Sequence, residues 1–135
     1  MTQQTSKGYH ITLWILQVVL GALYIMAGAG KSFQPIEELA KQMPWVNSVS
    51  VELVRFIGAS ELLGGLGLIL PALLRIKPIL TPVAAIGLAL VQVFAAVFHI
   101  SRGEYAFIGI NLVFVAIAIF IAWGRTKKAP IYARA

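Results

Sequence analysis

Cysteine is absent from the 135 residues of this chain. Its absence excludes disulfide bonds, metal sites and iron–sulfur clusters built on thiolates, and any thiol–disulfide relay within the chain. Histidine is almost as scarce, with two residues, so the sequence predicts no metal site and no haem held by the protein's own side chains. No covalently bound cofactor is expected.

Charged residues are also scarce. Charged residues make up 12% of the chain, whereas hydrophobic residues make up 59% and the mean hydropathy is +0.86. Soluble domains carry about 25% charged residues. This chain has too little charge to cover its own surface with polar groups unless lipid solvates much of it. The composition therefore predicts a single transmembrane domain over residues 1–135, with the lipid bilayer as its partner.

Four apolar segments are separated by polar or proline-containing stretches, at residues 11–30, 52–70, 78–100 and 105–123. Each is long enough to cross a hydrocarbon core about 30 Å thick at about 1.5 Å per residue. Helix is the expected form, because lipid offers the backbone no hydrogen-bond partners. We expect Pro71 to close the second span, and Thr81 and Pro82 to form the cap and first turn of the third. The predicted fold class is all-α, an integral membrane four-helix bundle.

Basic residues are distributed unevenly over the two ends of this bundle. The positive-inside rule assigns the more basic end to the cytoplasm, which places both termini inside a multi-pass protein of the cell membrane. This bias also explains the net charge of +6, so nucleic-acid binding is not needed to account for it. Seven of the eleven basic residues lie on that side: Lys7, Arg75, Lys77, Arg125, Lys127, Lys128 and Arg134.

The longest connection joins the first two spans on the outer side. Its segment IEELAKQM places Ile36, Leu39, Ala40 and Met43 on one face, which predicts a short amphipathic helix. Trp45, which follows, is typical of membrane interfaces. The segment either joins the spans at the interface or forms a lid over the outer mouth of the bundle, and the first arrangement is the commoner one.

Polar residues in the spans follow stripes that also carry small residues. Glu61 interrupts the second span within FIGASELLGG, while Gln92 and Asn111 lie in the third and fourth spans. Lys31 and His99 stand at the outer ends of the first and third. Helical spacing directs all five toward one another in the outer half of the bundle. Because a carboxylate at this depth must be protonated, paired or hydrated, we expect Glu61 to form the floor of a polar pocket, with Lys31 near enough to pair with it.

Structural roles remain open for each of these residues. A hydrogen bond between helices is the commoner role for a single amide, which applies to Gln17, Gln92 and Asn111. A purely structural ion pair is the alternative to a ligand or proton site for Glu61. An ordinary interfacial histidine explains His99 equally well. No nucleophile with a histidine and an acid beside it is visible, so the sequence leaves open whether the chain is an enzyme.

The motifs AGAGKS, RFIGASELLGGLGLILP, LTPVAAIGLALVQ, FHISRGE and IAWGR follow one another between Trp14 and Arg125. In this order they resemble the DoxX-like family of small four-helix membrane proteins. The family name comes from a subunit associated with thiosulfate:quinone oxidoreductase, and distant relatives include assembly chaperones of membrane receptors. Most members have no assigned activity, so the resemblance implies fold and topology more than function.

Two functions of different classes follow. In the first, the pocket binds a lipophilic ligand with a polar head group, such as a quinone, and the chain is a redox accessory subunit. Glu61 and His99 would exchange protons, while Lys31, Gln92 and Asn111 would hold carbonyl or hydroxyl oxygens. In the second, the chain is a non-enzymatic partner that assists or stabilises another membrane protein, or a further copy of itself, through its helix faces and outer loop.

Overall fold

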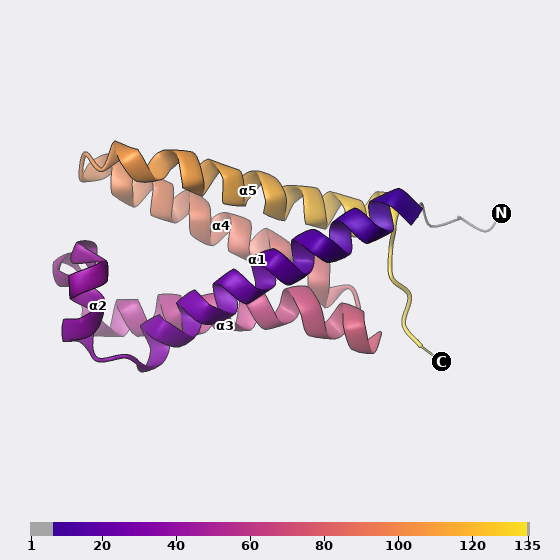
Figure 1. The fold of residues 1–135 in the computed structure, drawn as a ribbon, viewed down its shortest axis with the longest axis horizontal. Helices are drawn as coiled ribbons and strands as arrows, with labels where there is room; N and C mark the ends of the chain where they lie inside the picture. Colours follow the sequence, from indigo (N-terminus) through magenta and orange to yellow (C-terminus); the bar gives the residue numbers. More distant parts are fainter. Residues whose placement is uncertain (1–6, 135) are drawn as a thin grey trace.

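The computed structural model describes residues 7–134, which form helices and connecting turns without a β-strand in that range (Figure 1). Four of the helices found there are long and apolar enough to cross a membrane, counting the short turns that flank the last of them. The protein is therefore an all-α membrane protein. Its helices are α1 (Lys7–Phe33), α2 (Ile36–Gln42), α3 (Val51–Leu74), α4 (Leu80–Ser101) and α5 (Ile108–Trp123). Shorter turns are η1 (Pro44–Ser48), η2 (Tyr105–Phe107) and the π-helical η3 (Gly124–Lys128).

The long helices pack as two pairs, α1 on α3 and α4 on α5, and α3 joins the pairs by packing on α4. Helix α1 meets α5 mainly near the start of α1 and the end of α5 (Figure 1). We call this the terminal end of the bundle, and the opposite end, which carries α2, the α2 end. The two pairs converge at the terminal end and separate toward the α2 end (Figure 1).

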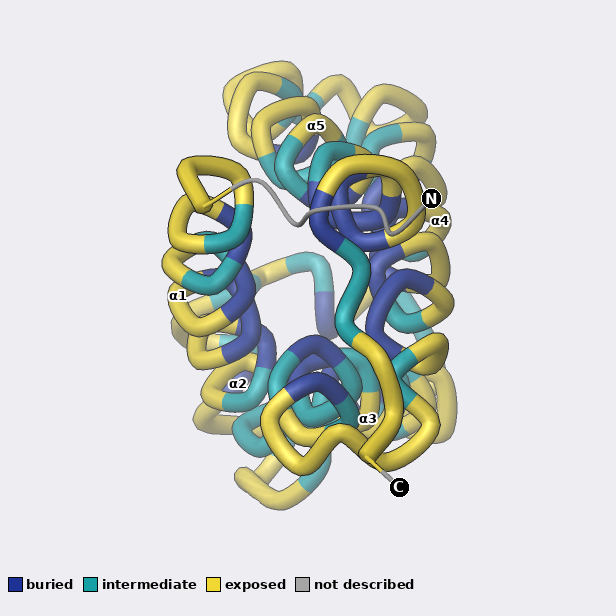
Figure 2. The backbone as a smooth tube through the Cα atoms, turned by 90° about the vertical axis from the view of Figure 1, so that its right-hand side faces the viewer, coloured by how far each residue is buried: buried dark blue, intermediate teal, exposed yellow. Residues whose placement is uncertain are grey.

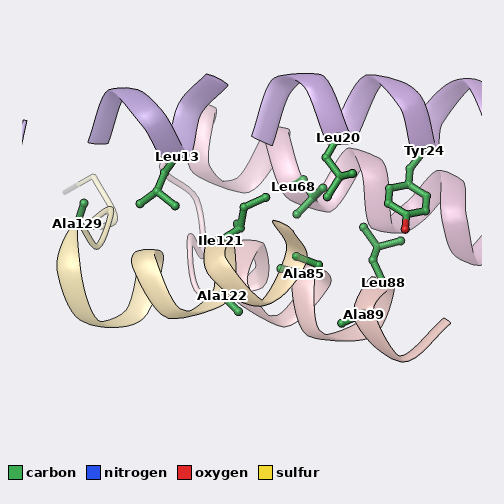
Figure 3. Packing of buried hydrophobic residues seen from close by; sticks show 11 residues of the cluster. Leu13, Leu20, Tyr24, Leu68, Ala85, Leu88, Ala89, Ile121, Ala122 and Ala129 are labelled. Carbon is green, nitrogen blue, oxygen red and sulfur yellow. The ribbon is translucent and has the colours of Figure 1, made fainter. Parts of the chain in front are cut away.

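Apolar side chains face outward as well as inward, as expected of helices solvated by lipid. Figure 2 looks along the bundle from the terminal end and shows buried positions facing the interior, with exposed positions around the outside. The interior cluster is aliphatic apart from Tyr24 (Figure 3). It includes Leu13, Leu20, Tyr24, Leu68, Leu88 and Ile121.

Glycines allow α1 and α3 to approach closely. Gly28 lies against Gly58 and Leu62, and a Cβ built on Gly28 would stand 2.7 Å from the Gly58 carbonyl oxygen. One helical heptad away, a Cβ on Gly65 would stand 2.7 Å from the Gly21 carbonyl oxygen. Small residues at such positions are what membrane helices use to bring their backbones together.

The short helix α2 is fixed to the bundle by a second apolar cluster. Leu39 from α2, Val46 from η1 and Val54 from α3 are buried together. Glu38 and Lys41 of α2 form an exposed pair, with Nζ and Oε1 3.1 Å apart. The connection between α1 and α3 thus lies against the α2 end rather than extending away from it.

Two expectations about helix ends are wrong, whereas Pro82 does lie in the first turn of α4 as expected. Helix α3 continues through Pro71 to Leu74. A proline in the last turn removes only one N–H donor. Its carbonyl oxygen still accepts hydrogen bonds from the backbone N–H groups of Arg75 and Ile76. Helix α4 begins at Leu80 without a side-chain cap. The Thr81 hydroxyl instead donates to the Gly67 carbonyl oxygen on α3, at 3.0 Å, and so ties two helices together.

Candidate functional site

A cavity of about 520 Å³ lies where the helix pairs separate, between α1, α3, α4 and α5, with η1 beside it. Its wall is mostly apolar. The five residues singled out from the sequence all line it: Lys31, Glu61, Gln92, His99 and Asn111. The structure therefore brings these side chains together, and their binding of a ligand stays a prediction.

Glu61 and Lys31 form an ion pair in the wall of this cavity, with Nζ and Oε1 2.6 Å apart. Their side chains are 6% and 11% exposed. Close packing of the backbones places them there, since a Cβ on Gly58 would stand 2.7 Å from the Lys31 Cβ. Arg55, the other cation nearby in sequence, donates to the carbonyl oxygens of Lys31 and Gln34, at 2.9 and 2.7 Å, and so holds the end of α1.

Asn111 is held between α4 and α5. Its amide nitrogen lies 3.5 Å from the Gln92 carbonyl oxygen. With the amide turned over, the nitrogen donates to the Phe107 carbonyl and the oxygen accepts from the Ala96 N–H at 3.2 Å. The turned-over orientation satisfies both amide atoms, one of them on the backbone of the neighbouring α4, which favours an interhelical role for Asn111.

His99 lies at the α2 end of the cavity, among aromatic rings and next to a carboxylate. Its Nδ1 is 3.1 Å from Glu104 Oε1, and its ring centroid is 4.8 Å from that of Phe107. The same carboxylate oxygen accepts from Arg102 Nε at 2.8 Å. Arg102 also donates to the Ser48 hydroxyl, which fastens η1 to the end of α4.

The contacts at Glu104 predict a pH dependence of stability. Hydrogen bonds from Arg102 and His99 lower the pKa of the Glu104 carboxyl. A lowered pKa in the folded state stabilises the protein above the pKa of the unfolded chain, and this contribution is lost as the pH falls through the folded pKa. Glu104→Gln should therefore lower the unfolding temperature in detergent at pH 7 by a small amount, and this difference should vanish in acid. A difference that stays constant from neutral to acid pH would contradict this account.

Tyr24 belongs to the site, although the sequence did not single it out. Its side chain is 2% exposed and lines the cavity. Figure 3 shows the ring directed from α1 into the bundle, toward Leu88. Gln92 and Glu61 lie near enough to interact with the hydroxyl, yet no group among residues 7–134 completes a hydrogen bond with it. The sequence contains a pattern that indicates Tyr24, because this residue shares a helix face with Lys31. The pattern is not specific, since a tyrosine in an apolar span is also an ordinary core residue.

A second polar cluster closes the terminal end. Gln17 donates to the Leu68 carbonyl oxygen at 2.7 Å, which confirms the interhelical bond expected for it. Its Oε1 accepts from Arg125 Nε at 2.5 Å, and Arg125 also donates to the Ala129 carbonyl oxygen at 2.8 Å. Arg125 is buried here. From the sequence it counted only as a basic residue of the terminal side, because its local context resembles an exposed tail.

No three His, Cys, Asp or Glu side chains lie close enough to hold a metal ion in the described range. Lys31 and Glu61 are charged side chains in the cavity wall, and the ion pair of Arg102 and Glu104 lies next to His99, which lines the α2 end. The site can therefore offer hydrogen-bond donors, a charge-balanced pair and an apolar wall to a ligand.

Comparison with known protein families matches residues 15–121 to the family model described as the DoxX-like family. This range includes all five residues proposed from the sequence, as well as Tyr24. Comparisons with curated proteins and with solved structures found no significant match.

Proposed function

This chain belongs to the DoxX-like family, and we propose that its cavity binds a lipophilic ligand with a polar head group, a quinone in the first instance. In this proposal the protein is a multi-pass cell-membrane protein that serves a redox system as an accessory subunit. A partner protein supplies the electrons, while this chain binds the ligand and exchanges protons with it.

One observation carries the proposal: buried polar groups converge on an otherwise apolar cavity. The volume of about 520 Å³ lies within the range of roughly 300–1,000 Å³ that is usual for small-molecule sites. An unpartnered buried hydroxyl is costly unless something binds it, and Tyr24 supplies one at the cavity wall. A ligand with an oxygen-bearing head group and an apolar chain matches both features.

The roles of the five sequence-proposed residues can be stated within this proposal. Gln92 is the amide available to a ligand oxygen, since Asn111 is engaged between α4 and α5. Lys31 and Glu61 present a paired cation and carboxylate. His99, next to Glu104, lies toward the α2 end and is suited to pass protons between the cavity and the aqueous side.

Analysis of co-purified lipids tests the proposal. The protein is extracted from membranes into polymer nanodiscs, without detergent exchange, and its organic extract is examined for quinones by mass spectrometry. We expect quinone in near-stoichiometric amount with the wild type and a reduced amount with Glu61→Gln. Quinone at the level of the bulk membrane in both preparations would contradict quinone binding. It would leave the assembly or interaction partner as the better account.

Orientation is tested by cysteine accessibility, for which a chain without native cysteine is well suited. Lys41 in α2 and Lys127 in η3 are both exposed and lie at opposite ends of the bundle. If both termini are cytoplasmic, an impermeant maleimide should label Lys41→Cys in intact cells and Lys127→Cys only after permeabilisation. The reverse pattern would place the cavity toward the cytoplasmic leaflet.

A further inference from the structure

The cavity has an opening toward the bilayer between α3 and α4. Near the terminal end these helices touch, because Gly64 lies against Leu88 and Gly67 against Ala84. The hydrogen bond from the Thr81 hydroxyl of α4 to the Gly67 carbonyl oxygen of α3 also lies near the terminal end. Toward the α2 end the cavity is lined by side chains that are at the same time exposed on the outer surface: Phe56 at 69% and Phe94 at 71%.

Contacts close the cavity at its α2 end and narrow it between α1 and α5. On the side between α1 and α5, the rings of Tyr24 and Phe114 pack at a centroid distance of 5.8 Å, but Leu23 and Ile110 also line the cavity there and are 46% and 50% exposed. Toward the α2 end, Trp45 of η1 packs edge-on against Phe98 at 6.0 Å, and Arg102 holds Ser48. The α2 end is thus fastened by η1. Between α3 and α4, the exposed Phe56 and Phe94 form the cavity wall together with Ser60.

Charge in the cavity selects the kind of head group. The Lys31 ammonium already has the Glu61 carboxylate at 2.6 Å, so the pair carries no net charge to attract an anion. An anionic head group would have to displace a carboxylate from this pair or remain unpaired in a low dielectric, which is costly. Neutral groups lie beside the pair: the Tyr24 hydroxyl, which completes no hydrogen bond within residues 7–134, and Gln92, whose side chain lies near it.

We infer that a neutral single-chain lipid enters the cavity from the bilayer between α3 and α4, with its head group first. Tyr24 then donates a hydrogen bond to an oxygen of the head group. The hydrocarbon chain of the lipid stays between Phe56 and Phe94. This inference rests on the proposed function and adds to it the route, the charge of the ligand and a residue that the sequence did not assign.

The first test concerns Tyr24. Tyr24→Phe removes only the hydroxyl, so in ligand-free protein it should leave the unfolding temperature unchanged or raise it, because an unsatisfied buried group is lost. Binding of decylubiquinone in phosphatidylcholine nanodiscs should weaken about three- to tenfold, the equivalent of one hydrogen bond. A lower stability without ligand, together with unchanged binding, would show that the hydroxyl is structural and would overturn its assigned role.

Charge selection is tested with three probes that carry similar single chains. Decylubiquinone and 1-monolaurin are neutral, and dodecyl phosphate is anionic. We expect the neutral probes to raise the unfolding temperature more than the anionic one. Binding of 1-monolaurin but not of decylubiquinone would refute quinone binding and keep the neutral-lipid inference. Preference for dodecyl phosphate, or binding of none of the probes, would overturn the inference.

The route is tested by blocking the opening at Ser60. Ser60→Trp, and Ser60→Leu as a smaller replacement, should slow association of decylubiquinone by at least severalfold. Leu63→Trp is the matched control, since Leu63 lies one turn away, is exposed and does not line the cavity. Equal association rates for all these variants and the wild type would exclude this route while leaving binding itself intact.

Discussion

Replacing Glu61 with leucine is expected to lower the free energy of unfolding by about 3–5 kcal/mol, which would be the largest effect of any single change in the cavity. The reason is the unpaired Lys31 ammonium that this change leaves behind, with its side chain only 11% exposed. The double variant Lys31→Met/Glu61→Leu should recover most of the loss, because it removes both charges and keeps the volume. Unfolding by SDS titration in mixed micelles measures all three proteins.

Glu61→Gln separates structure from ligand binding. Glutamine keeps the volume and a hydrogen bond to Lys31, so the fold should persist, while retention of the co-purified lipid should decrease. Unchanged lipid with lost stability would identify the Lys31 and Glu61 pair as purely structural. If Glu61→Leu were as stable as the wild type, the pair would contribute nothing to the fold, and the close contact of α1 with α3 would have to rest on glycine packing alone.

Gly28→Ala is expected to produce the second large effect. A Cβ at this position would stand 2.7 Å from the Gly58 carbonyl oxygen and 2.8 Å from the Leu62 Cα. Both are backbone atoms, so the helices must move apart rather than a side chain turning away. Overpacking of this kind costs about 1–3 kcal/mol. Because Lys31 lies one turn further along α1, the separation should also weaken its contact with Glu61.

Gly87→Ala is the matched control for this change. Gly87 lies within α4, where a Cβ meets no atom within 4 Å, so alanine should be neutral or stabilise the helix by about 0.5–1 kcal/mol. Unfolding temperatures of the two variants in the same detergent give the comparison. Equal stability of Gly28→Ala and Gly87→Ala would mean that α1 and α3 do not depend on their glycine contact.

The polar residues of the spans and their helical faces were readable from the sequence because both follow from periodicity. In a membrane, a polar residue within an apolar span is costly on the lipid side, so its face is also the interior face. The sequence alone therefore directs Glu61, Gln92 and Asn111 to the interior. The approach of Lys31 to Glu61 followed from the same reasoning, together with the glycines on both helices.

Other features required the fold. Tyr24 is an ordinary interior aromatic until the separation of α1 from α4 leaves its hydroxyl without a partner. In the sequence, Arg125 looks like part of a basic tail. It is buried against Gln17 only because α1 and α5 pack together at the terminal end. The sequence suggests that Thr81 is a helix cap, whereas its hydroxyl donates a hydrogen bond to the Gly67 carbonyl oxygen on a neighbouring helix. Each of these depends on a partner remote in sequence, which local patterns do not report.

The bond between Gln17 and Arg125 also has a consequence for biogenesis. It joins residues 108 positions apart, so it can form only after the last helix has entered the membrane. Inserted helices associate in a second stage, and here the α1 and α3 pair can assemble while α5 is still being synthesised. The cavity lies at the seam between an early and a late helical hairpin. Until translation ends, its polar wall remains open to lipid, and a nascent chain arrested after α4 presents Glu61, Gln92 and Tyr24 to whatever insertion factor stands beside it.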